Sequence, residues 1–415
     1  MTFPTPPDAD EALGATIRRA YDRSEFFRST LSGAGVRPDT DFSVADIGKL
    51  PFTTKEQLRE AYPFGWTSVP QRDVVRIHAS SGTTGRRTLC TYTKRDIADW
   101  VEMFARCMTY AGVTPDDRLQ VAAGYGLWTA GWGIQAAAEH IGAMAIPVGP
   151  GNTDLQLELM RDLGTTAMVA TASFALLLGE KVWANGLTDQ LSLRVALLGS
   201  ERWGERTRSR IEELLGIRTY DLYGLTELWG PGAGVECDQH DGIHVWSDHY
   251  HLEIVDPETL RPLPPGSRGE IVVTTYRKEA TPLLRYRTRD LSHLYPDPCP
   301  CGSPYPRIGR LTGRTDDMIK LRGVLFFPKQ VEHVVSGVET GTGEFQIELG
   351  RLASGEETLT VRLEAEDAPG LAEDVARRLR SEIGLGATVE VVPPGTLPRS
   401  EKKTQRVYDK REDRA

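Results

Sequence analysis

Short apolar runs alternate with helical patterns between about residues 115 and 225, and this alternation constrains the fold more than any other feature. The runs expected to be strands are RLQVAAG, AMAIPVG, TTAMVAT, LRVALLG and IRTYDLYG. The helices expected between them include GWGIQAAAEHIG and NTDLQLELMRDLG. Strands and helices that alternate in this way form a parallel sheet covered by helices, so the pattern predicts an α/β fold. Sites in such sheets lie beyond the carboxyl ends of the strands.

The stretch RIHASSGTTGRRTLCTYT (76–93) places six small residues, Ser80 to Gly85, between two expected strands. The phosphate loop of common NTPases needs Lys-Ser/Thr directly after its second Gly, and it opens a helix. Here two arginines follow the second Gly, and the expected helix, KRDIADWVEMFARCM, comes later. Two interpretations remain. The stretch is a plain hairpin turn, or it is a loop that holds phosphates with backbone N–H groups and the hydroxyls of Ser81, Thr83 and Thr84.

The pattern changes after Gly230, and it changes again near residue 316. GIHVW, HLEIVDP and RGEIVVTT alternate with period two around turns, which indicates an antiparallel β region. Beyond Asp316 the chain alternates strand, helix, strand, strand, helix, strand, a pattern typical of a separate α+β domain. We therefore expect two domains, residues 1–315 and 316–415. The polar tail LPRSEKKTQRVYDKREDRA is expected, by composition alone, to be a solvated and frayed end.

Charge and cysteine usage exclude several classes of protein. The formal net charge of −9 argues against binding to nucleic acid or to an anionic membrane surface. The start, MTFPTPPDADEALG, lacks the features of a secretory signal, and no apolar run approaches the ~18 residues of a membrane span. Five cysteines favour a reducing cytoplasm over a disulfide framework. Cys90 and Cys107 fall on a strand and a helix pattern, so we expect buried thiols.

Five stretches are informative because of their joint order and spacing along the chain. They are SSGTTGRRT (80–88), YGLTE (223–227), YRTRDL (286–291), TGRTDDMIKLRG (312–323) and PRSEKKTQR (398–406). Together they resemble the adenylate-forming superfamily of acyl-CoA synthetases, adenylation domains and luciferases, and most closely its phenylacetate-CoA ligase branch. The segments LPFTTKEQLREAYPFG and YGLTELWGPG also look like that branch. The resemblance covers nearly the whole chain, and it implies a large N-terminal domain with a small mobile C-terminal domain.

The resemblance implies a reaction in two steps. A carboxylate attacks the α-phosphate of ATP and expels pyrophosphate, and a thiol then attacks the acyl-adenylate and expels AMP. The implied cofactors are ATP, Mg²⁺ and CoA, the implied partner is a small aromatic acid, and we expect a homodimer. Other enzymatic interpretations pass the adenylate to an amine, a hydroxyl or a carrier protein, or adenylylate a phenolic hydroxyl. An inactive nucleotide sensor is a further alternative, against which the retained Glu227, Asp290 and Lys403 argue.

The resemblance also implies roles for single residues. Lys403 matches the catalytic lysine, but the family usually has Gly before that lysine, so Lys402 competes for the role. Glu227 would hold Mg²⁺, and the alternative interpretation is an ordinary exposed glutamate with no metal bound. Thr83 would be a catalytic donor on the small-residue loop. The other nucleotide-binding positions implied in the large domain are Ser80, Ser81, Gly82, Thr84, Gly85, Ser200, Glu201, Asp221, Tyr223, Gly224 and Thr226.

Three residues near the domain boundary complete the implied nucleotide site. Asp290 would bind both ribose hydroxyls, since a carboxylate can accept from two donors, and its alternative is a salt bridge with Arg287 or Arg289. Arg314 would add a donor near the ribose or the phosphates. Asp316 matches the hinge about which the small domain turns, and its alternative is a turn cap.

A possible metal site lies in the antiparallel region, in ECDQHDGIH (236–244) and PCPCG (298–302). Cys237, His244, Cys299 and Cys301 give the Cys₃His set that suits structural Zn²⁺. The Cys-x-Cys spacing is shorter than the usual Cys-x₂-Cys, so loop thiols beside a surface histidine are the alternative. His240 competes with His244 as the fourth ligand. Relatives in the resembled branch carry a similar pattern, which favours a structural zinc and His244.

The acid would be lined by GYGLWTAGWG (124–133) and LLGSERW (197–203), which mix aromatic walls with small residues. The expected pocket residues are Tyr125, Trp128, Ala130, Gly131, Gly199 and Trp229. Ordinary helix packing is the alternative for each of them. Trp128 and Trp229 stand where phenylacetate-activating relatives usually have smaller side chains. A shortened pocket would favour a compact amino- or hydroxyl-substituted benzoate over phenylacetate.

Overall fold

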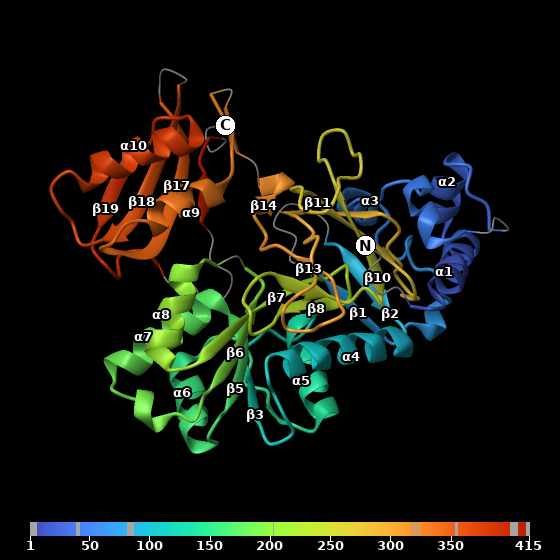
Figure 1. Ribbon diagram of the computed structural model, residues 1–415, viewed down its shortest axis with the longest axis horizontal. Coiled ribbons are helices and arrows are strands. Elements are labelled where there is room, and N and C mark those ends of the chain that lie inside the picture. The colour runs from blue at the N-terminus through green and yellow to red at the C-terminus, as the bar shows by residue number, and fades with distance from the viewer. Residues whose placement is uncertain are drawn as a thin grey trace.

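The computed structural model describes residues 6–38, 42–80, 87–201, 203–317, 319–322, 324–352, 356–398 and 406–411. A large body holds the elements from α1 to β14, and a smaller body holds α9, α10 and β17 to β19 at one side of it (Figure 1). Separate apolar cores support this division. The core of the small body runs from Ile319 to Leu385, and the two cores of the large body end at Ile308 and at Ile217.

The central sheet of the large body has the strand order β13-β9-β8-β7-β6-β5-β3-β4. Strands β4, β3, β5, β6 and β7 are parallel, whereas β8, β9 and β13 continue the sheet antiparallel. The strand bounds are β3 (Arg118–Val121), β4 (Met144–Ile146), β5 (Ala167–Thr171), β6 (Val195–Gly199), β7 (Arg218–Leu225), β8 (Gly230–Glu236), β9 (Ile243–Val245) and β13 (Arg307–Ile308). All five runs expected to be parallel strands are confirmed.

Helices cover both faces of this sheet because successive strand residues point to opposite sides. In β6, Val195 and Leu197 pack in one core with α4 and α5, and Ala196 and Leu198 pack in another with α6, α7 and α8. The helices are α4 (Lys94–Tyr110), α5 (Ala130–Ile141), α6 (Thr153–Asp162), α7 (Ala172–Ala184) and α8 (Glu205–Leu215), and a 3₁₀ turn, η3, spans Thr188–Gln190. Figure 1 shows α7 and α8 on one side of the sheet and α4 and α5 on the other.

The N-terminal segments pack against this body. They are α1 (Ala9–Arg23), α2 (Glu25–Gly33), η1 (Val44–Lys49), α3 (Lys55–Glu60) and η2 (Gln71–Asp73). They lead to the antiparallel pair β1 (Arg76–Ala79) and β2 (Leu89–Tyr92), which confirms that the small-residue loop joins two strands. Helix α3 begins with a capping box formed by Thr54 and Gln57, which fixes its first turn.

An antiparallel sheet, with the order β10-β11-β12-β14, adds the second β region that the sequence predicts. Its strands are β10 (Tyr250–Val255), β11 (Gly269–Thr275), β12 (Tyr286–Ser292) and β14 (Gly313–Arg314). Thr53, two residues before α3, joins this sheet, because its N donates to Arg285 O at 3.1 Å and Arg287 N donates to Thr53 O at 2.9 Å. The start of α3 is therefore held beside β12.

The small body is an α+β unit, as expected. Its sheet has the order β19-β18-β17-β20, and β15 pairs with β16 beside it. Its elements, with the turn η4 that leads into it, are η4 (Thr315–Asp317), β15 (Ile319–Leu321), β16 (Val324–Phe326), α9 (Pro328–Ser336), β17 (Gly341–Arg351), β18 (Glu357–Ala365), α10 (Leu371–Ile383), β19 (Thr388–Val392) and β20 (Val407–Asp409).

The C-terminal tail differs from its expected structure, whereas Cys90 and Cys107 agree with theirs. The tail is not wholly frayed, because residues 407–409 form β20 and pair in parallel with β17. The polar composition of the tail does not predict this strand, because the strand with which it pairs lies about 60 residues earlier in the chain. Cys90 and Cys107 are both fully buried, as expected, and burial raises the pKa of Cys90 to about 12. In the part of the chain that the structure describes, no helix combines the length and apolarity of a membrane span.

Candidate active site

Asp290 lies at the centre of the nucleotide side of the candidate site. It sits on β12 opposite Arg314 of β14, and Arg314 Nη1 donates to its Oδ1 at 2.9 Å. The hydroxyl of Tyr223, from β7, donates to Oδ2 at 3.0 Å. Only 3% of Asp290 is exposed, and this burial raises its pKa to about 6 although Arg314 acts in the opposite direction. Three motifs far apart in sequence therefore meet at one carboxylate.

The alternative prediction, a salt bridge of Asp290 with Arg287 or Arg289, is wrong. Arg287 binds Glu270, with nitrogen–oxygen distances of 3.1 and 2.7 Å, and Arg289 lies 3.6 Å from Glu56. In a strand, neighbouring side chains point to opposite faces, so neither arginine shares the face of Asp290.

Asp316, the expected hinge residue, is bound to the same arginine as Asp290. Arg314 Nε and Nη2 donate to its two oxygens at 2.8 and 3.0 Å. This bidentate pair lowers the pKa of Asp316 even though burial acts to raise it. Asp316 lies in the 3₁₀ turn η4, between β14 and the small body. The hinge position is thus linked through Arg314 to the nucleotide side.

Glu227, the expected Mg²⁺ ligand, is buried rather than exposed, with 4% of its surface accessible. Its Oε1 lies 3.2 Å from Nζ of Lys55 and accepts no hydrogen bond from the described residues. A buried carboxylate with free lone pairs beside a cation fits a site for a hard metal ion. The backbone of Glu227 is also fixed, because Lys278 Nζ donates to its carbonyl at 2.5 Å.

Lys55 and Lys278 are site residues that the sequence analysis missed. Lys55 stands in LPFTTKEQLREAYPFG, a segment that carried the resemblance but was given no chemical role. Lys278 is fully buried, lies 5.4 Å from the ring centres of Tyr92 and Trp229, and has its pKa lowered by burial. No local pattern marks either lysine, because their partners are distant in sequence.

The small-residue loop leaves β1 beside the expected acid pocket. Ala79 N donates to Leu127 O at 2.7 Å, which ties the end of β1 to the loop after β3. Ser80 N donates to Thr88 O at 3.0 Å, and the buried Oγ of Ser80 has no partner among the described residues. The other predicted positions of this loop lie outside the described residues: Ser81, Gly82, Thr83, Thr84 and Gly85.

The end of β6 carries three predicted residues. A side chain at Gly199 would meet Leu222 O at 2.7 Å, so only Gly permits this approach of β6 to β7. Ser200 adopts φ of 69°, a strained conformation for a residue other than glycine. Glu201 accepts from Ser173 N at 2.5 Å, and its carboxylate therefore contacts the first turn of α7.

The other predicted residues of β7 and the following turn are positioned by side chains and by close backbone approach. Asp221 accepts from Trp203 Nε1 at 3.1 Å, and burial together with the charge of Glu236 raises its pKa to about 7. A side chain at Gly224 would lie 2.3 Å from the carbonyl oxygen opposite, so the strands touch here. The carbonyl of Thr226 accepts from the hydroxyl of Tyr92 at 3.1 Å.

The predicted acid pocket gathers around the start of α5. Gly131 N donates to Gly124 O at 2.8 Å, and a side chain at Gly131 would meet the ring of Tyr125 at 2.8 Å. Trp128 is half-buried, and its ring would lie 2.9 Å from a side chain at Gly124. Ala130 is buried. The segment from 124 to 131 therefore folds tightly on itself, with Tyr125 and Trp128 as its large rings.

Trp229 has surroundings different from those of Trp128. It is 1% exposed, adopts φ of 62°, and its indole nitrogen has no hydrogen-bond partner among the described residues. A side chain at the following Gly230 would meet Thr129 Cβ at 3.0 Å. The turn after β7 thus packs against the start of α5, with Trp229 enclosed and Trp128 partly accessible.

Lys402 and Lys403 lie outside the described residues, but both ends of their segment are anchored. Leu397 N donates to the buried Glu364 at 2.6 Å. On the other side, Arg406 donates to both oxygens of Glu344 at 2.9 and 3.1 Å. Two carboxylates of the small body therefore hold the flanks of the predicted catalytic segment.

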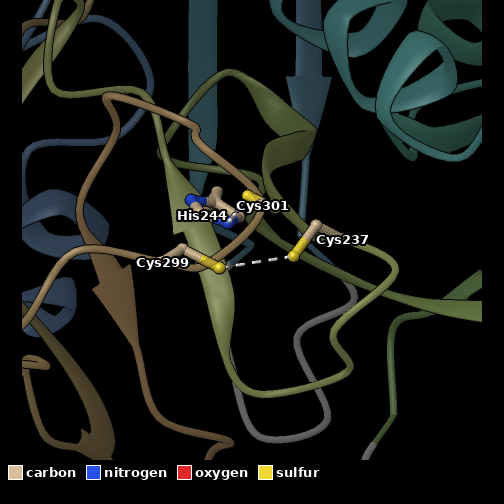
Figure 2. A group of neighbouring side chains, drawn as sticks. All are labelled: Cys237, His244, Cys299 and Cys301. Carbon is tan, nitrogen blue, oxygen red and sulfur yellow. Dashed lines mark hydrogen bonds between the residues drawn. The ribbon is translucent and has the colours of Figure 1, made fainter.

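The candidate metal cluster is brought together by β8, β9 and the loop before β13 (Figure 2). The ligand atoms of Cys237, His244, Cys299 and Cys301 all lie within 4.8 Å of one another. Cys237 Sγ is 3.6 Å from Cys299 Sγ, and Cys301 Sγ is 3.4 Å from His244 Nε2. A tetrahedral zinc with ordinary bond lengths has edges of about 3.8 Å between sulfurs and about 3.6 Å between sulfur and nitrogen. The four side chains therefore fit a zinc ion.

The geometry selects His244 over His240. His244 Nδ1 lies 3.1 Å from Tyr305 O, which leaves Nε2 to face the cysteines. His240 Nδ1 is instead 3.1 Å from Arg208 and 3.4 Å from Glu236. The cluster lies on segments different from those that carry Glu227 and Asp290.

Comparisons with known proteins agree with this geometry. Residues 16–277 match the family AMP-binding enzyme, and residues 323–411 match the AMP-binding enzyme C-terminal domain. A phenylacetate-coenzyme A ligase of Pseudomonas putida is 39% identical over 97% of this chain and 93% of its own length. The corresponding enzyme of Escherichia coli (strain K12) is 40% identical over 97% of this chain and 94% of its own length.

Solved structures of 2-hydroxyisobutyryl-CoA ligase show the same fold. Its postadenylation state, with 2-HIB-AMP bound, superposes with a TM-score of 0.87 at 27% identity, over 99% of this chain and 91% of that one. Its thioesterification state superposes with a TM-score of 0.70 at 28% identity, over 98% of this chain and 91% of that one. The chain therefore belongs to the family of AMP-binding enzymes, in the branch of AMP-forming CoA ligases that includes the phenylacetate-CoA ligases.

Proposed function

We propose that this enzyme activates an aromatic carboxylic acid with ATP and transfers the acyl group to the thiol of CoA. One observation supports a ligand at the convergent motifs above all others. Among the described residues, buried polar atoms without a hydrogen-bond partner include Ser80 Oγ, Glu227 Oε1 and Thr315 Oγ1, each on or beside a motif, and Glu227 Oε1 has only its ion pair with Lys55. Buried polar atoms without partners are rare and cost free energy, so a ligand that meets them is favoured.

In the first step, a carboxylate oxygen of the acid bonds to the α-phosphorus of ATP while the bond to pyrophosphate breaks. Asp290 would accept hydrogen bonds from the ribose hydroxyls, and Arg314 would compensate the negative charge of Asp290. Mg²⁺ bound at Glu227 would neutralise charge on the phosphate oxygens. Lys403 would bring a cation to the α-phosphate and the carboxylate from the small body. Positive groups must converge here because an anion approaches a polyanion.

Lys55 has a related role in this proposal. Its ion pair with Glu227 compensates that carboxylate while no metal is bound, because an isolated buried charge is costly. A metal ion at Glu227 would release the ammonium of Lys55 toward the phosphates or the acid. The start of α3 is held on β12, so this lysine stays beside the nucleotide side.

In the second step, the CoA sulfur bonds to the acyl carbon, and the bond between that carbon and the AMP oxygen breaks. CoA is the favoured acceptor because full-length relatives carry that name. Transfer to an amine, a hydroxyl or a carrier protein is the competing proposal. ATP–pyrophosphate exchange over a panel of aryl acids tests the first step, and mass detection of products with CoA tests the second. Exchange without any CoA thioester would favour another acceptor, and no exchange with any acid would favour an inactive nucleotide sensor.

The acid itself is proposed to be a substituted benzoate or an arylacetate. The relatives at about 40% identity are phenylacetate-CoA ligases, which supports an arylacetate. The half-buried Trp128 favours a shorter acid if its ring closes the pocket.

We further propose that the chain divides near residue 315, with ATP and the acid held by the large domain, and that the Cys₃His cluster holds a structural Zn²⁺.

Lys403→Ala is expected to slow adenylate formation at least ~100-fold and to spare thioester formation from supplied acyl-adenylate. A lysine on a rotating domain serves only the step that places it in the site. Rates of both half-reactions are the measurement, and Lys402→Ala is the matched control. Equal loss in both steps would contradict the role, and a selective loss in Lys402→Ala would move the role by one residue.

Adenosine is expected to bind about tenfold more weakly at pH 5 than at pH 7.5. Only the ionised Asp290 accepts from two hydroxyls, and with a pKa of about 6 about one tenth of it is ionised at pH 5. Adenosine is the chosen probe because it has no phosphate that titrates in this range. Equilibrium dialysis across pH should show this loss in the wild type, and Asp290→Asn should bind weakly and lack it. An unchanged profile in Asp290→Asn would exclude Asp290 as its source.

Benzoates are expected to be preferred over matched phenylacetates by roughly 10–200-fold in kcat/KM, the usual effect of one methylene in an apolar pocket. Trp128→Leu should move the ratio toward phenylacetates. Trp229→Leu is the control, since an enclosed core ring should give a loss of stability without a change in the ratio. A wild type that prefers phenylacetates, or a ratio that does not respond to Trp128→Leu, would contradict the pocket assignment.

Protein purified without added zinc is expected to contain close to one zinc per chain by elemental analysis. Cys299→Ser should lower both the zinc content and Tm, because loss of a structural ligand removes folding free energy. Asp297→Ala, at an exposed position on the same loop, is the matched control. Metal-free protein of unchanged stability would rule out the site.

A further inference from the structure

Arg206 joins the large body to the small one. It lies in the first turn of α8 and donates to the carbonyls of Ser336 and Glu339 at 3.1 and 3.0 Å. It also donates to the carbonyls of Val338 and Gly341. All four acceptors belong to the small body: Ser336 ends α9, Val338 and Glu339 lie in the turn after it, and Gly341 begins β17. Figure 1 shows α8 beside that body.

This contact is chemically suited to hold two bodies together and to release them. The carbonyl of Ser336, the last residue of α9, lacks a partner within the helix and lies at the negative end of the helix dipole. A guanidinium offers five donors in a planar fork, so it can serve several carbonyls together. Backbone carbonyls carry no formal charge, and Arg206 is half-buried, so water can replace the bonds when the bodies separate. Lys329, at the start of α9, adds a further contact between the bodies, because its Nζ donates to Leu311 O at 2.9 Å.

The arrangement held by Arg206 has a counterpart among the solved relatives. The chain superposes better on the postadenylation state of 2-hydroxyisobutyryl-CoA ligase than on its thioesterification state, although the sequence compared is the same. The difference in TM-score, 0.87 against 0.70, therefore concerns the arrangement of the parts. In this structure, the contacts of Arg206 belong to the arrangement that resembles the postadenylation state.

We propose that Arg206 is a positioning residue that holds the small domain in the arrangement preceding thioester formation and must release it for CoA to react. The proposal rests on the proposed two-step function. It makes no use of Lys403 or of any group that touches the nucleotide. A ligand-independent contact of this kind biases the populations of two arrangements, so its loss should slow adenylate formation without slowing thioester formation.

The test compares Arg206→Ala, Arg206→Lys and Arg210→Ala in the full-length enzyme. Arg210 lies on the same helix, is exposed, and binds Glu213 of that helix at 2.9 Å, so it is a matched control. We expect Arg206→Ala to slow ATP–pyrophosphate exchange up to about tenfold and to leave thioester formation from supplied acyl-adenylate equal or faster. Arg206→Lys should give a smaller change in the same direction, and Arg210→Ala should change neither rate. Equal losses in both steps, or no change in either, would overturn the proposal.

A second measurement does not depend on activity. Cysteines introduced at Ser209 and Glu339, both exposed, are joined by a short bismaleimide, and the linked peptide is quantified by mass spectrometry. The yield should fall when Arg206→Ala is added and should stay constant when Arg210→Ala is added. An unchanged yield would overturn the proposal even if the rates differ. If the wild type catalyses neither half-reaction, the proposed function fails, and the yield alone then decides whether Arg206 holds the two bodies.

Discussion

The guanidinium of Arg314 connects the nucleotide side of the site to the hinge. It bonds to Asp290 on one side and to Asp316 on the other, and Asp290 is only 3% exposed. An uncompensated charge at such a depth would cost several kcal/mol, so the position of β14 against β12 is fixed electrostatically. Tyr223 extends the connection to β7, which leads directly to Glu227. The carboxylate expected to bind ribose and the turn expected to swing the small domain thus share one cation.

Strained backbone accompanies this arrangement. Eight described residues other than glycine adopt positive φ, and four of them, Ser200, Trp229, Arg285 and Arg289, lie in or next to segments that carry the site motifs. Such conformations cost free energy and persist only where the surroundings fix them. Ser200 follows the glycine at which β6 approaches β7, and Trp229 is held by Lys278 beneath it. The backbone of the large body is therefore constrained beside the candidate site, and in the proposed function adaptation to the two reactions falls to the small body.

The sequence predicts the parts of the molecule whose cause is local or carried by a motif. Consecutive residues of β6, such as Val195 and Ala196, are apolar, which indicates a strand buried on both faces, and the structure confirms it. The ion pair of Lys55 with Glu227 could not be predicted, because it joins segments separated by about 170 residues. The strand β20 was missed because its polar residues gain order only from their pairing with β17. The missed features join distant segments that carry no recognised motif, whereas the predicted ones have a local pattern or a motif at each partner.

The strength of the contact between the two bodies is bounded by the two-step chemistry. Hydrogen bonds from a charged donor contribute about 1.5–3 kcal/mol each where they are well buried, and four of them at full strength would exceed 5.5 kcal/mol. A bias of that size holds about 10⁴ molecules in one arrangement for each one in the other, and the thioester step would be slowed by the same factor. Arg206 avoids such a strong bias because it is half-buried and its acceptors are uncharged backbone carbonyls between the last residue of α9 and the first of β17, which water can also solvate. A contact that selects one arrangement without trapping it is what an enzyme with two half-reactions on one site requires.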